Sequence, residues 1–159
     1  MLLSEQAYKK FDREIAKFPA DQRQSAVMAA LAIAQSEQGW LSPEVIQEVA
    51  DYLGMPAIAV QEVATFYAMY NTRPVGKSKI TVCTNLPCAL SGGVAAAEYL
   101  KKKLGIDFKE TTGDGQFTLQ EGECMGACGD APVLMVNNKR MCSHMSNDKL
   151  DALVEELKK

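Results

Sequence analysis

The sequence predicts an α/β domain preceded by a small N-terminal helical bundle. Apolar residues recur at helical spacing through residues 1–72, and short strand-like runs take over after residue 77. Residues 71–76, which include Asn71, Pro74 and Gly76, have the composition of a linker between the two parts. Four of the five cysteines fall in two closely spaced pairs, both in the second part. We therefore expect domains at 1–72 and 77–159.

The first domain contains four predicted helices. The first follows the capping residue Ser4, and the second covers residues 21–37. The third has Ser42 as its N-cap and ends at Gly54, and the fourth begins at Pro56. The apolar residues expected to face inward are Ala7, Phe11, Ile15, Phe18, Val27, Ala30, Leu31, Ala34, Val45, Ile46, Val49, Leu53, Ile58, Val60, Val63 and Phe66.

Helices joined by short turns also occur in DNA-binding domains, so the charge of this region is informative. Residues 1–76 hold 6 Lys or Arg and 9 Asp or Glu, a net charge of 6 − 9 = −3. A DNA-binding surface needs the opposite sign. We therefore expect a helical bundle that does not bind nucleic acid.

The second domain alternates strands and helices. The predicted strands cover residues 79–83, 108–112, 117–120, 133–136 and 139–142. One helix is predicted over residues 90–104, and a last one carries Leu150, Leu153, Val154 and Leu157 at helical spacing. The order β-α-β-β-β-β-α predicts a sheet covered by two helices.

The two cysteine pairs are the strongest functional signal in the sequence. Cys83 and Cys88 form a C-x4-C motif, and Cys124 and Cys128 form a C-x3-C motif. The chain lacks a signal-peptide pattern, and a cytosolic protein does not normally build a disulfide framework. Each pair follows a predicted strand, so both can lie at one edge of the sheet. We expect these four thiols to bind metal.

Sets of four thiolates bind either zinc or an iron–sulfur cluster. Structural zinc usually uses tighter loops, whereas a C-x4-C arm occurs in plant-type [2Fe–2S] ferredoxins. Glycines flank both pairs, and glycine allows backbone N–H groups to approach sulfur. Apolar neighbours expected to exclude water are Leu86, Pro87, Met125, Ala127 and Pro132. A [2Fe–2S] cluster is favoured, with a structural zinc scaffold as the alternative.

Three segments together resemble one known family. They are the Cys83–Cys88 loop, the run from Glu123 to Gly129 with its following Ala-Pro pair, and the Ala-Thr-Phe-Tyr run at residues 64–67. The sequence resembles the thioredoxin-like [2Fe–2S] subunit of NADH:quinone oxidoreductase, which is respiratory complex I. The resemblance implies a thioredoxin-like fold and one [2Fe–2S] cluster bound by Cys83, Cys88, Cys124 and Cys128.

The resemblance also implies the setting of the protein. In that family, the cluster exchanges single electrons with the FMN of an NADH-binding flavoprotein subunit, beside other iron–sulfur subunits. The chain has no dinucleotide-binding or P-loop motif, so NADH and FMN are expected on the partner. The complex would place the chain in the cytoplasm, peripheral on the inner membrane and not inserted in it. Alternatives are the equivalent subunit of an NAD-reducing hydrogenase or formate dehydrogenase, and a free ferredoxin.

Two further residues bear on the site. Cys142, the fifth cysteine, is either a reserve ligand or redox sensor, or a small apolar side chain on a strand; the second interpretation is favoured. His144 is the only histidine, and a Rieske centre needs two, which excludes that class. His144 is expected at the surface.

Overall fold

A computed structural model describes all residues from Met1 to Lys159. The chain divides into two units, Met1–Pro74 and Val75–Lys159. The sequence placed the corresponding boundaries at residues 72 and 77. None of the helices is long and apolar enough to cross a membrane.

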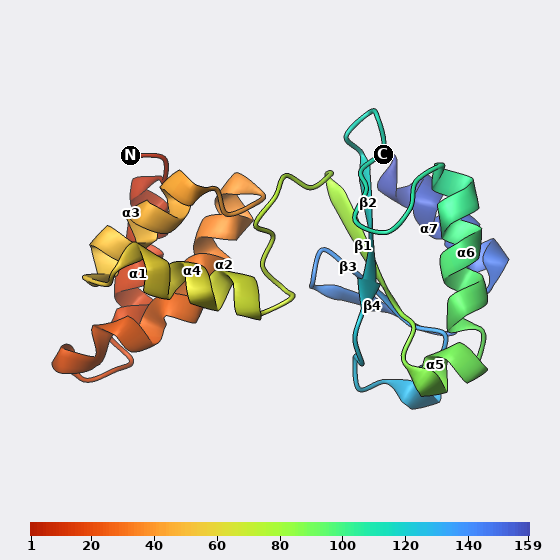
Figure 1. Cartoon of the computed structure of the whole chain (residues 1–159), viewed down its shortest axis with the longest axis horizontal. Helices are drawn as coiled ribbons and strands as arrows, with labels where there is room; N and C mark the ends of the chain where they lie inside the picture. The colour runs from red at the N-terminus through yellow and green to blue at the C-terminus, as the bar shows by residue number, and fades with distance from the viewer. The chain divides into compact units, whose positions relative to one another are not determined.

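The first unit is entirely helical (Figure 1). It consists of α1 (Glu5–Ile15), the 3₁₀ helix η1 (Ala20–Ala26), α2 (Val27–Gln38), α3 (Pro43–Leu53) and α4 (Ala57–Phe66). Its core is built around Phe11, Leu31 and Leu53, which are fully buried or nearly so. Apolar positions spaced three or four residues apart supply this core, as expected for amphipathic helices.

Helix caps fix the ends of α1 and α3. The Ser4 hydroxyl accepts a hydrogen bond from the backbone N–H of Ala7 at 3.2 Å, and Ser42 does the same for Val45 at 3.3 Å. Gly54 ends α3 in the left-handed conformation, which glycine adopts without strain. These three boundaries agree with the prediction.

Three details of the first unit differ from the prediction, the first being that Phe18, expected to face inward, is exposed beyond the end of α1. Residues 20–26 form a 3₁₀ helix with a kink at Gln22, so α2 begins at Val27 and not near residue 21. Apart from Ala26, residues 20–26 offer no apolar side chain that is buried in the core.

In α4, Val60 and Ala64 face the core, whereas Ile58 and Phe66 are exposed. The inward face of α4 is therefore narrower than predicted.

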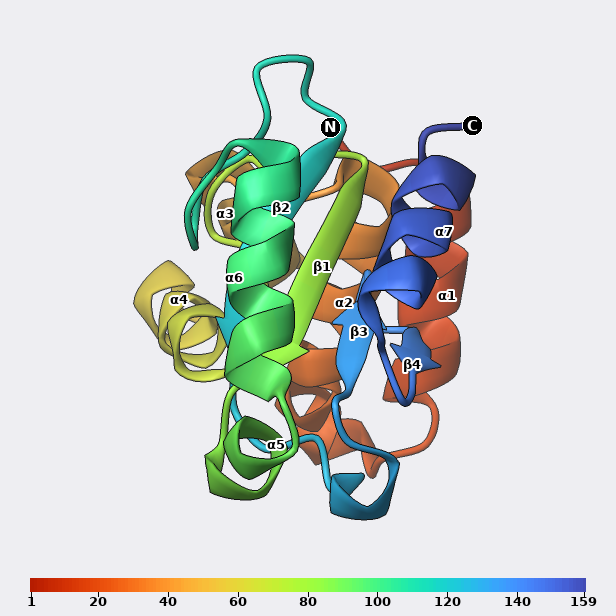
Figure 2. The same ribbon diagram turned by 90° about the vertical axis from the view of Figure 1, so that its right-hand side faces the viewer.

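The second unit is an α/β layer. Its elements are β1 (Ser78–Cys83), α5 (Leu86–Leu90), α6 (Gly93–Leu104), β2 (Phe117–Gly122), the 3₁₀ helix η2 (Cys128–Asp130), β3 (Leu134–Val136), β4 (Arg140–Cys142) and α7 (Asn147–Leu157). The strand order is β2-β1-β3-β4, with β1 parallel to β2 and the other pairs antiparallel. Helices α6 and α7 lie side by side on one face of the sheet (Figures 1 and 2).

The core of this unit lies between the sheet and the two long helices. Ile80 and Leu119 from the sheet pack with Leu100 of α6 and Leu150 of α7, and all four are fully buried. The alternation along β1 and β2 places every second side chain on this face. The sheet is thereby held as a rigid base for the loops at its ends.

Two predicted elements of the second unit are wrong in detail. Residues 108–112 are not a strand; only Thr111 bridges Thr118, because Lys109 has φ 68° and turns the chain. The helix predicted over 90–104 is two helices, α5 and α6. Gly92, at φ 92°, separates them in a conformation that other residues adopt only with strain.

Candidate metal centre

The parallel pairing of β1 and β2 brings the two cysteine motifs to one end of the sheet. Cys83 is the last residue of β1, and its register partner is Gly122, the last residue of β2. The first motif follows β1 into α5, and the second follows β2 into η2. Figures 1 and 2 both show α5 and η2 at this same end of the unit. Residues from far apart in the sequence are thus neighbours here.

Cys83 and Cys88 form a buried inner pair. Their exposed fractions are 1% and 2%, and Val133 packs with them in a small apolar cluster that Met125, Ala127 and Ala131 border. Burial and a hydrogen bond between the two thiols raise the pKa of Cys88. Metal binding would therefore have to displace a proton from this thiol.

Cys124 and Cys128 form an exposed outer pair. The backbone N–H of Gly126 points at the Cys124 sulfur, with 3.4 Å between nitrogen and Sγ. Gly126 has φ 70°, so the turn that creates this contact favours glycine. Cys128 begins η2 and contributes to raising the pKa of Cys88 through its charge, which links the two pairs electrostatically.

The donor set at this end of the sheet fits an iron–sulfur group. All five cysteines are free thiols, and four of them occupy this one region as two pairs. The inner pair has the apolar lining that limits access of water, and the outer pair has a backbone N–H directed at sulfur. No group of three or more His, Cys, Asp or Glu side chains is gathered closely enough to hold a single metal ion. The assignment of Cys83, Cys88, Cys124 and Cys128 as ligands thus stays a prediction.

Gly93, the first residue of α6, packs directly on the inner pair. A Cβ atom at this position would lie 2.7 Å from the carbonyl oxygen of Cys83 and 2.8 Å from that of Cys88. Both contacts are with backbone, which cannot move aside like the end of a flexible side chain. The Cys83–Cys88 loop keeps its shape only with glycine at position 93.

The lining of the site differs in part from the prediction. Met125 and Ala127 pack against the inner pair as expected, but Leu86 is 70% exposed and excludes no water. Sequence reasoning missed Val133. Its backbone N–H donates a hydrogen bond to the Cys88 sulfur, which lowers the pKa of that thiol, but burial and the contact with Cys83 raise the pKa by more. Its place at the start of an apolar run was the available signal.

Sequence reasoning also missed two hydrogen bonds that cross between the cysteine loops. The Thr84 hydroxyl donates to Glu121 at 2.7 Å, and the Asn85 side-chain amide donates to Glu123 at 3.0 Å. Thr84 directly follows Cys83, and Glu123 directly precedes Cys124. Nothing in the local sequence pattern signals these contacts.

Cys142 lies outside the site, and His144 is a surface residue beside η2. Cys142 is a buried residue of β4 in the main core, and burial raises the pKa of its thiol. A thiol of this kind is a poor nucleophile, in agreement with the favoured interpretation. His144 is exposed and lies 3.7 Å from the Asp130 carboxylate.

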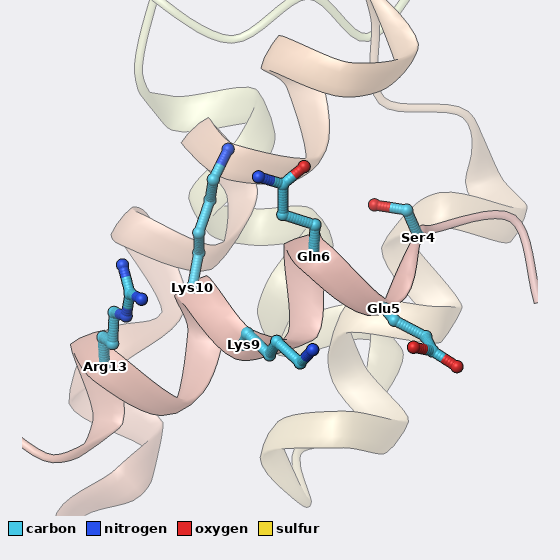
Figure 3. A pocket seen from close by; sticks show the side chains of 6 residues that line it. All are labelled: Ser4, Glu5, Gln6, Lys9, Lys10 and Arg13. Carbon is cyan, nitrogen blue, oxygen red and sulfur yellow. The ribbon is translucent and has the colours of Figure 1, made fainter.

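The first unit carries an open hollow of about 490 Å³ along α1. Ser4, Glu5, Gln6, Lys9, Lys10 and Arg13 line it (Figure 3). All six belong to α1 or its cap, and none is buried. The hollow is a charged surface with no enclosed polar group, and it contains none of the cysteines.

Comparison with known proteins identifies the family. The family model of the thioredoxin-like [2Fe–2S] ferredoxin matches residues 11–158. The E subunit of NADH-quinone oxidoreductase from Rickettsia conorii is 43% identical over 144 residues, which is 90% of this chain and 86% of the relative. An E subunit of the same enzyme from Rhizobium meliloti is 43% identical over 143 residues, 90% of this chain and 83% of the relative.

A solved structure shares the fold. An NAD⁺-reducing [NiFe]-hydrogenase in the H₂-reduced state superposes with a TM-score of 0.70 at 21% identity, over 80% of this chain and 22% of the hydrogenase chain. The present chain thus spans about a fifth of that protein. The family match confirms the predicted thioredoxin-like fold and the predicted [2Fe–2S] cofactor. The chain belongs to the thioredoxin-like [2Fe–2S] ferredoxin family.

Proposed function

We propose that the chain is the electron-carrying [2Fe–2S] subunit of an NADH:quinone oxidoreductase, with Cys83, Cys88, Cys124 and Cys128 as cluster ligands. The observation that carries the ligand assignment is the parallel β1–β2 pair, which ends at Cys83 and Gly122 and so delivers both cysteine motifs to one place. Relatives that are 43% identical over 90% of the chain are named as a subunit of this enzyme. A [2Fe–2S] cluster supplies one-electron transfer when bound.

The chain's own residues provide ligation and control of the surroundings. The buried inner pair and its apolar neighbours Val133 and Met125 limit water, which strengthens electrostatic interactions near the sulfurs. The Gly126 N–H stabilises negative charge on the Cys124 sulfur. No residue acts as a general acid or base, because the redox chemistry belongs to the cofactor. The catalytic activity is that of the complex, and NADH and FMN bind to other subunits.

An exposed apolar surface beside the site supports docking on a flavoprotein partner. Leu86 and Leu90 on α5 are 70% and 81% exposed, and Val94 in the first turn of α6 is 48% exposed. Large apolar side chains that gather at the surface mark interaction sites. Because α5 also carries Cys88, a partner bound here would lie close to the cluster, as single-electron exchange with its flavin requires. The assembled complex would hold the chain peripherally on the cytoplasmic side of the inner membrane.

The test is anaerobic purification of the full chain followed by iron and sulfide analysis. We expect about two irons and two acid-labile sulfides per chain, and loss of both in the Cys83→Ser and Cys124→Ser variants. A colourless protein with one zinc would contradict the proposal.

A second candidate is the corresponding subunit of an NAD⁺-reducing hydrogenase, whose fold this chain shares. Affinity purification from the native host separates the two candidates. Co-purification with quinone-reducing membrane subunits supports the first, and co-purification with a nickel-containing subunit supports the second.

A further inference from the structure

Two hydrogen bonds join the cysteine loops where the backbone pairing of β1 and β2 ends. The last pair in the ladder is Cys83 with Gly122. Next to it, Thr84, the first residue after β1, donates to Glu121 of β2 at 2.7 Å, and Asn85 donates to Glu123, the first residue after β2, at 3.0 Å. Side chains thus join the start of the first cysteine loop to the end of β2 and to the start of the second cysteine loop.

These four residues occupy positions close to the proposed ligands. Thr84 and Asn85 lie between Cys83 and Cys88, and Glu123 is the neighbour of Cys124. A shift of either loop would change the separation between the inner and outer thiol pairs. We propose that Thr84–Glu121 and Asn85–Glu123 form a clamp that positions the two ligand loops for the [2Fe–2S] cluster and places two carboxylates beside it. The inference rests on the proposed ligand set.

The clamp has two effects that can be separated. The first is geometric, since partners that orient metal ligands typically contribute about 10–100-fold to metal affinity. The second is electrostatic. Carboxylates near a cluster disfavour the negative charge that the cluster gains on reduction, so the two glutamates lower the reduction potential of the cluster.

The geometric effect is tested with the Thr84→Ala/Asn85→Ala double variant. The full chain is purified with its cluster, and the release of iron to a chelator is timed by visible absorption. We expect release about 10-fold faster than in the wild type, and a wild-type rate in Thr84→Ser/Asn85→Gln, which keeps a hydroxyl and an amide donor.

A matched control is Thr112→Ala. Thr112 also donates to an exposed carboxylate, that of Asp114 at 2.5 Å, but this bond lies in the turn before β2, at the opposite end of that strand from the cysteines. We expect the wild-type release rate for this variant. Equal release rates in the double variant and in Thr112→Ala would overturn the clamp.

The electrostatic effect is tested with Glu121→Gln/Glu123→Gln. Glutamine keeps an acceptor oxygen for each hydrogen bond and removes the charge, so we expect near wild-type iron release with a reduction potential shifted to more positive values. An unchanged potential would overturn the electrostatic part. If the wild-type chain binds no cluster, both the ligand set and the clamp are wrong. If the wild type binds the cluster but the variants change neither iron release nor reduction potential, the clamp alone is wrong.

Discussion

Gly93 lies directly against the backbone of Cys83, so that a Cβ atom on Gly93 would come within 2.7 Å of the Cys83 carbonyl oxygen. Real Cβ atoms essentially never approach another atom this closely. The contact couples the first turn of α6 to the loop that holds the inner thiol pair. The shape of that loop therefore depends on the absence of a side chain at position 93.

Replacing Gly93 by alanine will displace the Cys83–Cys88 loop. Overfilling a packed site typically costs about 1–3 kcal/mol, and here the displaced atoms belong to the proposed ligands. We expect the Gly93→Ala protein to contain less than about half the wild-type iron and sulfide and to unfold at lower temperature. The control is Gly113→Ala, where a Cβ meets nothing within 4 Å. Full cluster content in Gly93→Ala would contradict the packing argument.

Replacing Cys142 by alanine will leave the cluster intact. Cys142 is buried among the apolar side chains of the main core, away from the two cysteine loops. We expect wild-type iron and sulfide content and a loss of stability of about 1 kcal/mol, as for a small cavity. Cluster loss in Cys142→Ala, with retention in Cys124→Ser, would show that the ligand set is wrong.

Polar residues at positions 86 and 90 will weaken binding of the flavoprotein partner. Both leucines are mostly exposed, so Leu86→Gln/Leu90→Gln should fold normally and keep its cluster. If they are buried at a subunit interface, we expect the dissociation constant to rise about 10-fold or more. Leu2→Gln, which changes an exposed leucine of the other unit, is the control for binding measured by calorimetry. Equal affinities in both variants would exclude this docking surface.

Loss of the Glu48 carboxylate will destabilise the helical unit. Glu48 accepts hydrogen bonds from the backbone N–H groups of Leu2 and Leu3, at 2.8 and 3.1 Å, and from the Tyr8 hydroxyl. Hydrogen bonds to a charged acceptor contribute about 1.5–3 kcal/mol each when buried, so we expect Glu48→Ala to lose about 1–3 kcal/mol at pH 7. The measurement is urea unfolding followed by far-UV circular dichroism.

The hydrogen bonds of Glu48 also make the stability of the helical unit depend on pH. Burial opposes ionisation of Glu48, but the hydrogen bonds from Tyr8, Leu2 and Leu3 outweigh it and lower the pKa of this carboxyl below 4.5. The ionised group therefore stabilises the fold above the unfolded-state pKa, and this contribution is lost as the pH falls through the lower folded-state pKa. The stability difference between wild type and Glu48→Ala should shrink below about pH 4.5. The control is Glu62→Ala on α4, whose carboxylate makes no such bonds, and we expect it to lose little stability at pH 7.

Structural features that depend on a few neighbouring residues could be predicted from the sequence. The Ser42-Pro43 pair places the start of α3, because a serine cap and a proline in the first turn act within a few residues. The two cysteine motifs and the strand before each also predicted that both motifs can lie at one edge of the sheet. The register of Cys83 with Gly122 confirms that both motifs lie at one end of the sheet.

Features that depend on distant partners could not be predicted. Residues 108–112 have strand-forming composition, but the positive φ of Lys109 interrupts the extended backbone, and only Thr111 forms a bridge with β2. The break between α5 and α6 depends on the positive φ of Gly92, which no helical periodicity reveals. Thr84 and Glu121 are 37 positions apart, and only the folded sheet makes them neighbours.

The parallel alignment of β1 and β2 has a consequence for biogenesis. The backbone pairing of these two strands, which pack on the main core, brings the two cysteine motifs to one end of the sheet. Small zinc domains, in contrast, stay unfolded until their metal arrives. In this chain the register of β1 with β2 aligns both motifs, so a slip in strand pairing during folding would also separate the proposed ligands.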